Sequence, residues 1–226
     1  MSEDRNTETH ETFDTQMAFN IVDGKRFPYD VVAKFLRSID IYKTLKGTRQ
    51  MFRFVKELGY YKNDGEDHLE QRMYDVVGEH FNTQRFKEVR EMVQVRTLVE
   101  SDDFVPPVRM VNLQNGFYDL ATNQFYEKDT KEDYSFLNFQ NCLPFEYKPR
   151  EYFYSKYGAP ELCPNIDGFF HRVLGSHNDV DRMYEWFGFH LIRVYQFKKM
   201  AFFLGGPNTG KSTTAQLLNS FLGKDP

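Results

Sequence analysis

The spacing of apolar residues in the first part of the chain predicts three helices and a group of short strands. Apolar side chains recur at helical intervals in three stretches, residues 29–38, 66–81 and 83–99. Pro28 and Thr83 favour helix starts at the first and third of these stretches. Strand character appears in three shorter stretches, residues 41–45, 50–55 and 58–61. Asn63-Asp64-Gly65 marks a turn, so a hairpin-rich region should precede two of the helices.

After a linker at residues 102–107, the pattern changes to hairpins followed by helices. Three more strands are expected, at residues 109–113, 117–120 and 124–127. Asn115-Gly116 supplies a turn signal between the first two of them. Residues 136–147 are expected to be extended. Helical spacing then returns in two stretches, residues 166–174 and 179–195.

The last part of the chain combines a short apolar run, a glycine-rich loop and a helix. Residues 200–204 are expected to form a buried strand, and residues 212–222 a helix. The apolar face of that helix would consist of Ala215, Leu218, Phe221 and Leu222. Between strand and helix, residues 205–212 fit the pattern of a phosphate-binding loop, which is Gly, four residues and Gly-Lys-Ser. Strand, loop and helix in this order are the context that the motif requires.

The loop contains the residue types that a nucleoside triphosphate needs. Its glycines let backbone N–H groups approach phosphate, and the helix that follows adds the partial positive charge of its N-terminus. Lys211 would place its ammonium against the β- and γ-phosphates as the candidate catalytic residue, and the Ser212 hydroxyl would bind Mg²⁺. The predicted nucleotide-binding residues are Gly205, Gly206, Pro207, Asn208, Thr209, Gly210, Lys211, Ser212 and Thr213. The alternative is a chance glycine turn before a helix, and the full pattern in this context argues against it.

Hydrolysis requires a further group that the sequence does not clearly supply. A P-loop ATPase uses an acidic residue on a second strand to hold Mg²⁺ and to position water. That residue normally follows the loop, where this chain offers only Asp225. Upstream, the nearest apolar run that ends in an acid is Gly116–Asp119, in a turn-rich hairpin. We therefore expect the chain as given to bind phosphate but to show negligible ATP turnover and no strand separation.

The composition is that of a globular protein with an ordinary core. Of the 226 residues, 40% are hydrophobic and 17% aromatic, and the mean hydropathy is −0.64. This length allows one large or two small domains. No apolar run approaches the length of a bilayer span, and the polar N-terminus does not resemble a signal peptide. Cys142 and Cys163 lack metal-ligand spacing, which favours free thiols in a reducing, cytoplasmic compartment.

Charge is concentrated in an acidic N-terminal tail. Residues 1–16 account for the whole net charge of −4, and we expect this stretch to be disordered. The neutral remainder argues against a protein that coats DNA, but it does not exclude a DNA motor with basic loops in a channel. The helix at 83–99 has a basic face formed by Arg85, Lys87, Arg90 and Arg96. Because Glu88 and Glu91 are interleaved with these residues, we favour a solvated face over a DNA-facing one.

Two other groups of residues are interpreted as structural. Residues 152–157 are rich in Tyr and Phe, and we favour aromatic packing under a loop over base stacking. His171, His177 and His190 have no spacing that suggests metal ligation, so we regard them as structural or surface histidines.

Several of these pieces occur in the order that is found in one known family. Asn115-Gly116 and Asp119-Leu120 form an NG..DL hairpin, and Leu143-Pro144 with Tyr147 forms an LP..Y segment. A helical pair and the glycine loop follow. Over roughly residues 41–223, the chain thus resembles the phage/plasmid primase C-terminal family and the poxvirus-type primase-helicases. The loop is the most specific piece, whereas the hairpin and the LP..Y segment count through their order.

The resemblance implies both a fold and a function. The fold is an α+β N-terminal module, followed by the first strand, P-loop and helix of an α/β, AAA+-like P-loop NTPase domain of superfamily 3. The cofactors are ATP and Mg²⁺, with Lys211 on the triphosphate and Ser212 on the metal. The partners are DNA and, in the full-length protein, further copies in a homo-hexameric ring, without a membrane. The place of action is the intracellular site where viral, plasmid or integrated-element DNA is replicated.

The expected organisation has four parts, which are a disordered acidic tail at 1–16, two halves of a helicase-associated module at 17–105 and 106–195, and the start of an ATPase domain at 196–226. The module should be separate from the segment that carries the loop. The leading hypothesis is the N-terminal portion of an ATP-dependent DNA helicase of the primase-helicase type. A truncated, non-enzymatic interaction module is one alternative. A P-loop kinase is another, and the long stretch before the loop counts against it.

Overall fold

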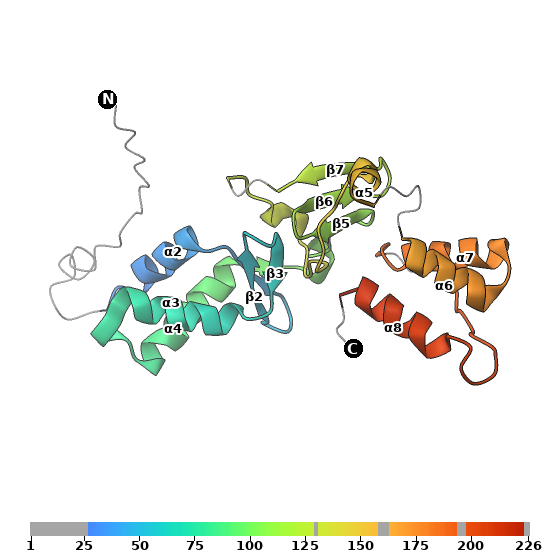
Figure 1. Cartoon of the computed structure of the whole chain (residues 1–226). Coiled ribbons are helices and arrows are strands. Elements are labelled where there is room, and N and C mark those ends of the chain that lie inside the picture. The colour runs from blue at the N-terminus through green and yellow to red at the C-terminus, as the bar shows by residue number, and fades with distance from the viewer. Residues whose placement is uncertain (1–26, 129–130, 158–162, 194–197, 224–226) are drawn as a thin grey trace, which may run out of the picture. The chain divides into compact units, whose positions relative to one another are not determined.

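The computed structural model describes residues 27–128, 131–157, 163–193 and 198–223, so the expected tail at 1–16 lies outside the described residues. The chain divides into two units (Figure 1). One comprises residues 1–55 and 61–105, and the other residues 56–60 and 106–226. Each unit combines helices with one small sheet, as the predicted α+β class requires. Residue 196 is not a boundary in this division, because residues 106–226 belong to one unit.

The first unit contains a four-stranded sheet with the strand order β3-β2-β1-β4. Its strands are β1 (Tyr42–Leu45), β2 (Met51–Val55), β3 (Tyr60–Lys62) and β4 (Leu98–Val99). β1 pairs antiparallel with β2 and parallel with β4, with Thr44 opposite Leu98. β1 and β2 lie where the sequence predicts them, whereas β3 begins two residues later than the predicted stretch at 58–61. β4 lies in a stretch that was expected to be the end of a helix.

Helices α2 (Tyr29–Ile39), α3 (Gly65–Val77) and α4 (Thr83–Arg96) lie together beside this sheet (Figure 1). Short 3₁₀ turns, η1 (Gly78–His80) and η2 (Ser101–Asp103), follow α3 and β4. Apolar residues at helical spacing in these three helices build the core, with completely buried side chains at Val32, Leu36, Leu69, Met73, Val89 and Val93. Burial of these side chains is the main favourable contribution to the stability of the unit.

α4 begins at the predicted residue, Thr83, but its N-cap and its end differ from the prediction. Asn82, not Thr83, is the N-cap, and its side chain accepts a hydrogen bond from Arg85 N at 2.8 Å. An N-cap needs an extended backbone, which Asn82 has with φ −153° and ψ 160°, whereas Thr83 is already helical. The helix ends at Arg96, because Leu98 and the residue after it pair with β1 instead.

Polar side chains join α3 to the sheet. The Tyr42 hydroxyl lies 2.9 Å from Nδ1 of His68, which projects from α3. Arg53 on β2 donates to both carboxylate oxygens of Asp64, at 3.2 and 3.0 Å, just before α3 begins. Burial is the main reason why the pKa of Tyr42 is raised and the pKa of His68 is lowered. The neutral form of His68 is therefore the one that the folded unit favours.

The second unit contains a three-stranded antiparallel sheet with the order β5-β6-β7. Its strands are β5 (Met110–Leu113), β6 (Gly116–Asp119) and β7 (Gln124–Glu127), followed by the 3₁₀ turn η3 (Ser135–Leu137). Phe117, Leu137 and Phe139 form a buried cluster at this sheet. The three strands agree with the sequence-based expectation.

The role of Gly116 differs from the one expected of an Asn-Gly turn. The loop consists of Gln114 and Asn115, and Gly116 pairs with Leu113 as a strand residue. Gly116 is not among the residues with positive φ, so it is not needed for a left-handed turn. A Cβ at this position would lie 2.3 Å from Phe125 Cζ and 2.4 Å from the carbonyl oxygen of Tyr126. Glycine is therefore required here because two strands approach closely.

The LP..Y segment lies along the outer edge of β5. Leu143 N donates to the Asn112 carbonyl at 2.9 Å, and Gln114 N donates to the Phe145 carbonyl at 3.1 Å. The Asn115 side chain then makes two hydrogen bonds to the Tyr147 backbone, of 3.0 Å from Nδ2 to the carbonyl and 2.8 Å from the amide to Oδ1. The NG hairpin and the LP..Y segment are thus two parts of one structural unit.

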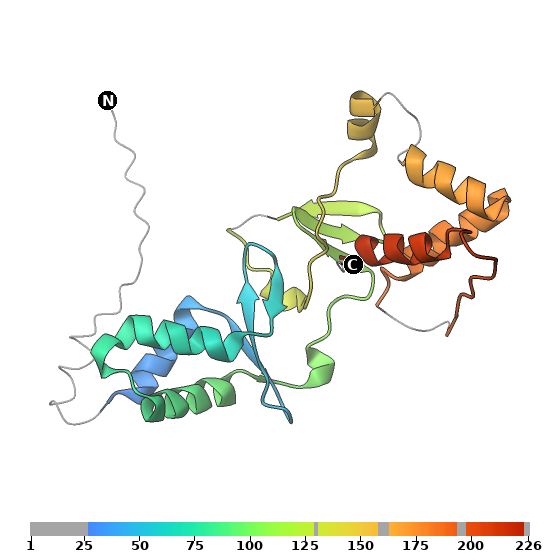
Figure 2. The same ribbon diagram turned by 60° about the horizontal axis from the view of Figure 1, so that its bottom comes forward.

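Four helices complete the second unit, α5 (Arg150–Tyr157), α6 (Pro164–Leu174), α7 (His177–Phe189) and α8 (Lys211–Phe221). α6 and α7 lie beside α8 (Figure 2), and their shared core contains Phe170, Val180, Met183, Phe187, Leu217, Leu218 and Phe221. α7 ends at Phe189, before the predicted end at Tyr195, which lies outside the described residues. No helix within the described residues is long and apolar enough to cross a membrane.

The expected strand at residues 200–204 is not formed. Residues 198–206 have no regular secondary structure, and Met200, Phe202 and Leu204 are 75%, 76% and 91% exposed. A buried strand needs neighbours for its backbone N–H and C=O groups. Within the described part of the chain, no strand pairs with this segment. The apolar run indicates strand character, but neither small sheet pairs with it in the described part of the chain.

Gly116→Ala tests the close approach of β6 and β7. We expect it to lower the free energy of unfolding by about 1–3 kcal/mol, because the new methyl group meets a backbone carbonyl as well as a ring. Gly168→Ala in α6 is the control, since a Cβ there meets no atom within 4 Å and alanine favours a helix by about 0.5–1 kcal/mol. Denaturant unfolding measures both changes. Equal stability of the two variants would contradict the packing role of Gly116.

The lowered pKa of His68 predicts that stability falls with acidification. Below its ordinary pKa of about 6.5, the unfolded chain binds a proton that the folded chain binds only at lower pH. The free energy of unfolding should therefore decrease as the pH falls through about 6.5 toward the folded pKa. Charges on Asp40 and Arg72 act on the same imidazole in opposite directions.

Unfolding curves of the wild type and of His68→Gln between pH 5 and pH 8, roughly the range in which an ordinary histidine titrates, test this expectation. The variant should lose part of the pH dependence, while His177→Gln should retain it. An unchanged profile in His68→Gln would show that other groups cause the acid sensitivity.

Candidate functional site

The glycine loop ends at the first residue of α8, against the end of α6. Gly210 is the N-cap of α8, with φ 82° in the left-handed region. A Cβ at Gly210 would lie 2.9 Å from Val173 Cγ1 and 3.1 Å from Phe169 Cζ. Both the backbone conformation and the contact with α6 therefore require glycine here. The contact between Gly210 and α6 thus fixes where α8 begins.

Lys211 is held by the loop that precedes it. Its ammonium donates to the carbonyl oxygens of Gly205 and Gly206, at 2.9 and 2.5 Å, and to Thr209 Oγ1 at 3.0 Å. Thr209 Oγ1 in turn donates to the Gly206 carbonyl at 2.9 Å. The loop thus closes around the charged group that the sequence selected as the catalytic candidate.

Space for a ligand is available along the loop. A Cβ at Gly206 would meet no atom within 4 Å, whereas one at Gly205 would lie 2.8 Å from Thr209 Oγ1. The first N–H groups of α8 have no carbonyl partner within the helix, and they carry its partial positive charge. A phosphate group fits this arrangement, because it would meet backbone donors and the ammonium of Lys211 on an exposed surface. The chemistry of these donors favours an anion.

The predicted binding residues differ in how the structure places them. Lys211 and Thr209 contact the loop glycines, and Asn208 has φ 60° at the loop tip. Ser212 and Thr213 are exposed in the first turn of α8, where the loop pattern expects a metal-binding hydroxyl at Ser212. Pro207 is exposed as well.

The buried face of α8 is shifted by one residue from the predicted one. Thr214 is 3% exposed, and its Oγ1 donates to the Gly210 carbonyl at 3.0 Å. Ala215, which was expected on the apolar face, is exposed. The spacing of Thr214 from Leu218 and Phe221 could have revealed this face, but its hydroxyl hid the residue from a search for apolar positions. Thr214 is a structural residue that the sequence interpretation missed.

The described residues provide no obvious metal centre. No group of three or more His, Cys, Asp or Glu side chains within the described ranges could hold a metal ion. Asp119, the upstream acid considered for magnesium, instead accepts a hydrogen bond at 2.8 Å from Ala121 N in its own turn. That hydrogen bond is the main cause of the lowered pKa of Asp119. Asp225, the only later acid, lies outside the described residues.

The cysteines, His190 and the aromatic segment at 152–157 make contacts of a structural kind. Cys142 and Cys163 are free thiols, and burial raises the pKa of Cys142. His190 contacts the Trp186 carbonyl through Nδ1 at 2.7 Å. The aromatic segment at 152–157 belongs to α5 rather than to a loop, and Tyr152 accepts a hydrogen bond from Lys156 at 3.0 Å. These contacts provide no arrangement for catalysis.

Comparison with known proteins gives one family. The sequence model of a family described as D5 N terminal like matches residues 20–175 of this chain. The matched part contains all described helices and strands of the first unit, the β5–β6–β7 sheet, the LP..Y segment and α6, and it ends before the glycine loop. No curated protein matches the chain.

Gly210→Ala tests how the loop is anchored. We expect a loss of about 1–3 kcal/mol in the free energy of unfolding, from the left-handed backbone and from the contact with α6. Gly206→Ala is the matched control, because its Cβ enters open space, and its effect should stay within about 0.5 kcal/mol. Thermal unfolding of the full chain measures both. A larger loss in Gly206→Ala than in Gly210→Ala would contradict the anchoring role of Gly210.

Proposed function

Since the chain belongs to the D5 N terminal like family, it is a replication protein of the primase-helicase type, and we propose that it is the N-terminal portion of an ATP-dependent DNA helicase. It would act in the replication of viral, plasmid or integrated-element DNA. ATP would bind at residues 205–213. The family match supports the type of protein, and the glycine loop supports the nucleotide.

The observation that carries the nucleotide assignment is the position of Lys211. The loop presents its ammonium at the N-terminus of an eleven-residue helix, α8, where the loop pattern expects the β- and γ-phosphates. Three loop acceptors hold the ammonium, at 2.9, 2.5 and 3.0 Å. Phosphate oxygens can replace these acceptors, because an anion forms a stronger charge-assisted bond than a carbonyl does.

Ser212 is the residue proposed to hold Mg²⁺. It follows Lys211 in the first turn of α8, and its side chain is exposed. The metal, when bound, would neutralise charge on the β- and γ-phosphates. Ser212 would supply one oxygen ligand, and Lys211 would orient the triphosphate. The acid that completes such a site in a P-loop ATPase has no candidate within the described residues after the loop.

The complete protein is proposed to work on DNA as a homo-hexamer inside the cell. Membership of a replication family supports DNA as the partner. The ring is a further step in the proposal, and it follows from the resemblance to superfamily 3 helicases, whose ATP sites are completed by a neighbouring subunit.

Calorimetric titration of ATP into the purified chain tests the nucleotide site. Lys211→Ala should weaken ATP binding by about a hundredfold, because a charge-assisted contact contributes roughly 2–3 kcal/mol. The backbone groups remain, so some diphosphate binding should survive. Lys87→Ala, on an exposed part of α4, is the control for loss of a positive charge. Unchanged ATP affinity in a folded Lys211→Ala variant would remove the main support for the helicase proposal.

Ser212→Ala distinguishes the contribution of the metal to ATP binding from that of the phosphate contacts. It should reduce only the part of ATP binding that depends on Mg²⁺, as measured by titrations with and without the metal. Ser220→Ala, an exposed position near the other end of α8, is the matched control. Equal losses with and without Mg²⁺ would show that Ser212 does not act through the metal.

A further inference from the structure

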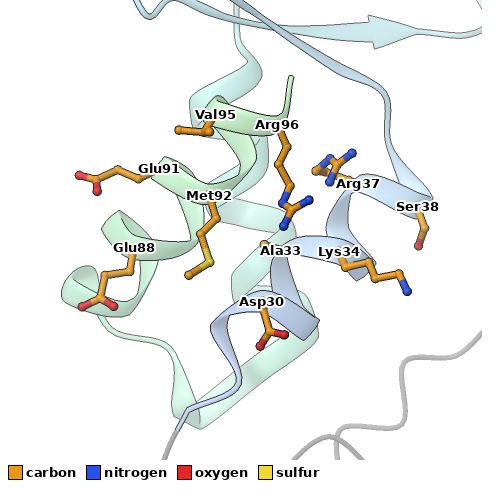
Figure 3. A pocket seen from close by; sticks show the side chains of 10 residues that line it. All are labelled: Asp30, Ala33, Lys34, Arg37, Ser38, Glu88, Glu91, Met92, Val95 and Arg96. Carbon is orange, nitrogen blue, oxygen red and sulfur yellow. The ribbon is translucent and has the colours of Figure 1, made fainter. Parts of the chain in front are cut away.

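Two arginines that are distant in the sequence lie at the same end of the α2–α4 pair. α2 leads into β1 and α4 leads into β4, and these two strands are parallel. The last turns of both helices therefore lie beside the same sheet edge. Arg37 lies in the last turn of α2, and Arg96 in the last turn of α4. Figure 3 shows both side chains on the same side of the groove between the helices.

The two arginines border two grooves of the first unit. The larger groove, of about 1120 Å³, runs between α2 and α4, and the smaller, of about 310 Å³, runs between the helix ends and β1 and β4. Arg37 and Arg96 line both. Lys34 lines the larger groove one helical turn before Arg37. We call these three cations, Lys34, Arg37 and Arg96, the basic end of the groove.

The charge of the basic end is not compensated nearby. Within the described residues, Arg37 and Arg96 take part in no ion pair or hydrogen bond between side chains. Asp40, which lines the smaller groove, is engaged with Arg72 Nε at 2.9 Å. Of the acids that line the larger groove, Asp30 lies in the first turn of α2, whereas Glu88 and Glu91 project from α4 on the side away from α2 and from both guanidinium groups (Figure 3).

The basic residues of α4 do not form one uniform face. Arg85 donates to the His80 carbonyl at 2.6 Å, and Arg90 pairs with Glu66. These two arginines are half-buried and have structural partners within the first unit, so they do not form the solvated face that the sequence favoured. Arg96 is exposed and differs from them, because within the described residues it has no ion-pair partner, and it lines the larger groove together with Arg37 of α2.

Stabilisation of the helix ends does not account for this arrangement. A cation in the last turn of a helix interacts with a partial charge of about −0.5. The two helix ends together supply roughly one negative charge, whereas the basic end carries three positive ones. Repulsion between Arg37 and Arg96 would be relieved by an anion that both can contact. Guanidinium groups bind phosphate with two parallel hydrogen bonds, which makes phosphate the anion that fits best.

We propose that the basic end of the α2–α4 groove binds the phosphodiester backbone of a nucleic acid. The larger groove has no aromatic side chain on which a base could stack and no amide that could read a base edge. Binding therefore shows little sequence preference. The acids Glu88 and Glu91 would repel phosphate on the side of α4 that faces away from α2, so the strand contacts the groove on the side of Lys34, Arg37 and Arg96. The proposal rests on DNA as the partner in the proposed function, but it does not involve the glycine loop.

Fluorescence anisotropy with a labelled, mixed-sequence oligonucleotide tests the site in the full chain, with single-stranded and duplex probes over a range of salt concentrations. Arg37→Glu combined with Arg96→Glu should weaken binding at least tenfold. Loss of two phosphate contacts should also lower the slope of log affinity against log salt by about 1 to 2. Lys56→Glu combined with Lys87→Glu is the control of equal charge, at exposed positions outside the grooves. Circular dichroism verifies that each variant is folded.

Three results would overturn the proposal. One is an equal loss of affinity in the two double variants, which would indicate a general effect of charge. Another is an unchanged salt slope in the arginine variant. The third is complete competition by inorganic phosphate at matched ionic strength, because a site for a single anion does not need a polymer. The arginine double variant should keep the ATP affinity of the wild type, because neither arginine belongs to the glycine loop, so failure of the nucleotide proposal can be distinguished from failure of this one. Arg37→Gln with Arg96→Gln repeats the test without charge inversion.

Discussion

The short sheet of the second unit depends on hydrogen bonds that two asparagine side chains make to the backbone. Asn112 is 2% exposed, and its Nδ2 lies 3.0–3.2 Å from the carbonyl oxygens of Leu58, Gly59 and Asn141. The opposite amide orientation would place an oxygen against these three carbonyls, so the surroundings fix the orientation. Asn115 provides the second set of bonds, to the Tyr147 backbone. Without these amides, the backbone groups of Gly59, Asn141 and Tyr147 would lose these hydrogen bonds.

The position of α8 in the second unit depends on the docking of the LP..Y segment against β5. Once the LP..Y segment lies along β5, Phe145 is placed against Phe221 of α8, with ring centroids 6.2 Å apart. Tyr147 stacks on Phe125 at 4.5 Å, on the sheet itself. Gly223, after α8, allows Pro144 to approach, since a Cβ would lie 2.6 Å from Pro144 Cδ. The sheet, the LP..Y segment and α8 therefore form one continuous set of contacts that ends at the glycine loop.

Local pattern predicted the elements of this fold better than it predicted their ends and their partners. The helices were found because buried side chains such as Leu69 and Met73 recur at intervals that only a helix brings to one face. The strand expected at 200–204 was wrong, because strand formation depends on a neighbour that a local pattern cannot show. Gly116 was recognised as special but for a turn rather than for close packing. In the glycine loop, the sequence indicated the chemistry of Lys211, and the buried hydroxyl of Thr214 became evident only from packing.

The contacts of Lys211 also determine which anions the loop can select. All three acceptors near its ammonium belong to the loop, so an arriving anion has to replace a carbonyl or hydroxyl oxygen for each bond that it forms. The free energy gained on binding is then the difference between the new hydrogen bond to the anion and the lost hydrogen bond to the loop. A small, singly charged anion gains little from this exchange. In the proposed function, a chain of linked phosphates would replace several contacts at once and bring more charge, so the closed loop would favour polyphosphates over the simple anions of the surrounding solution.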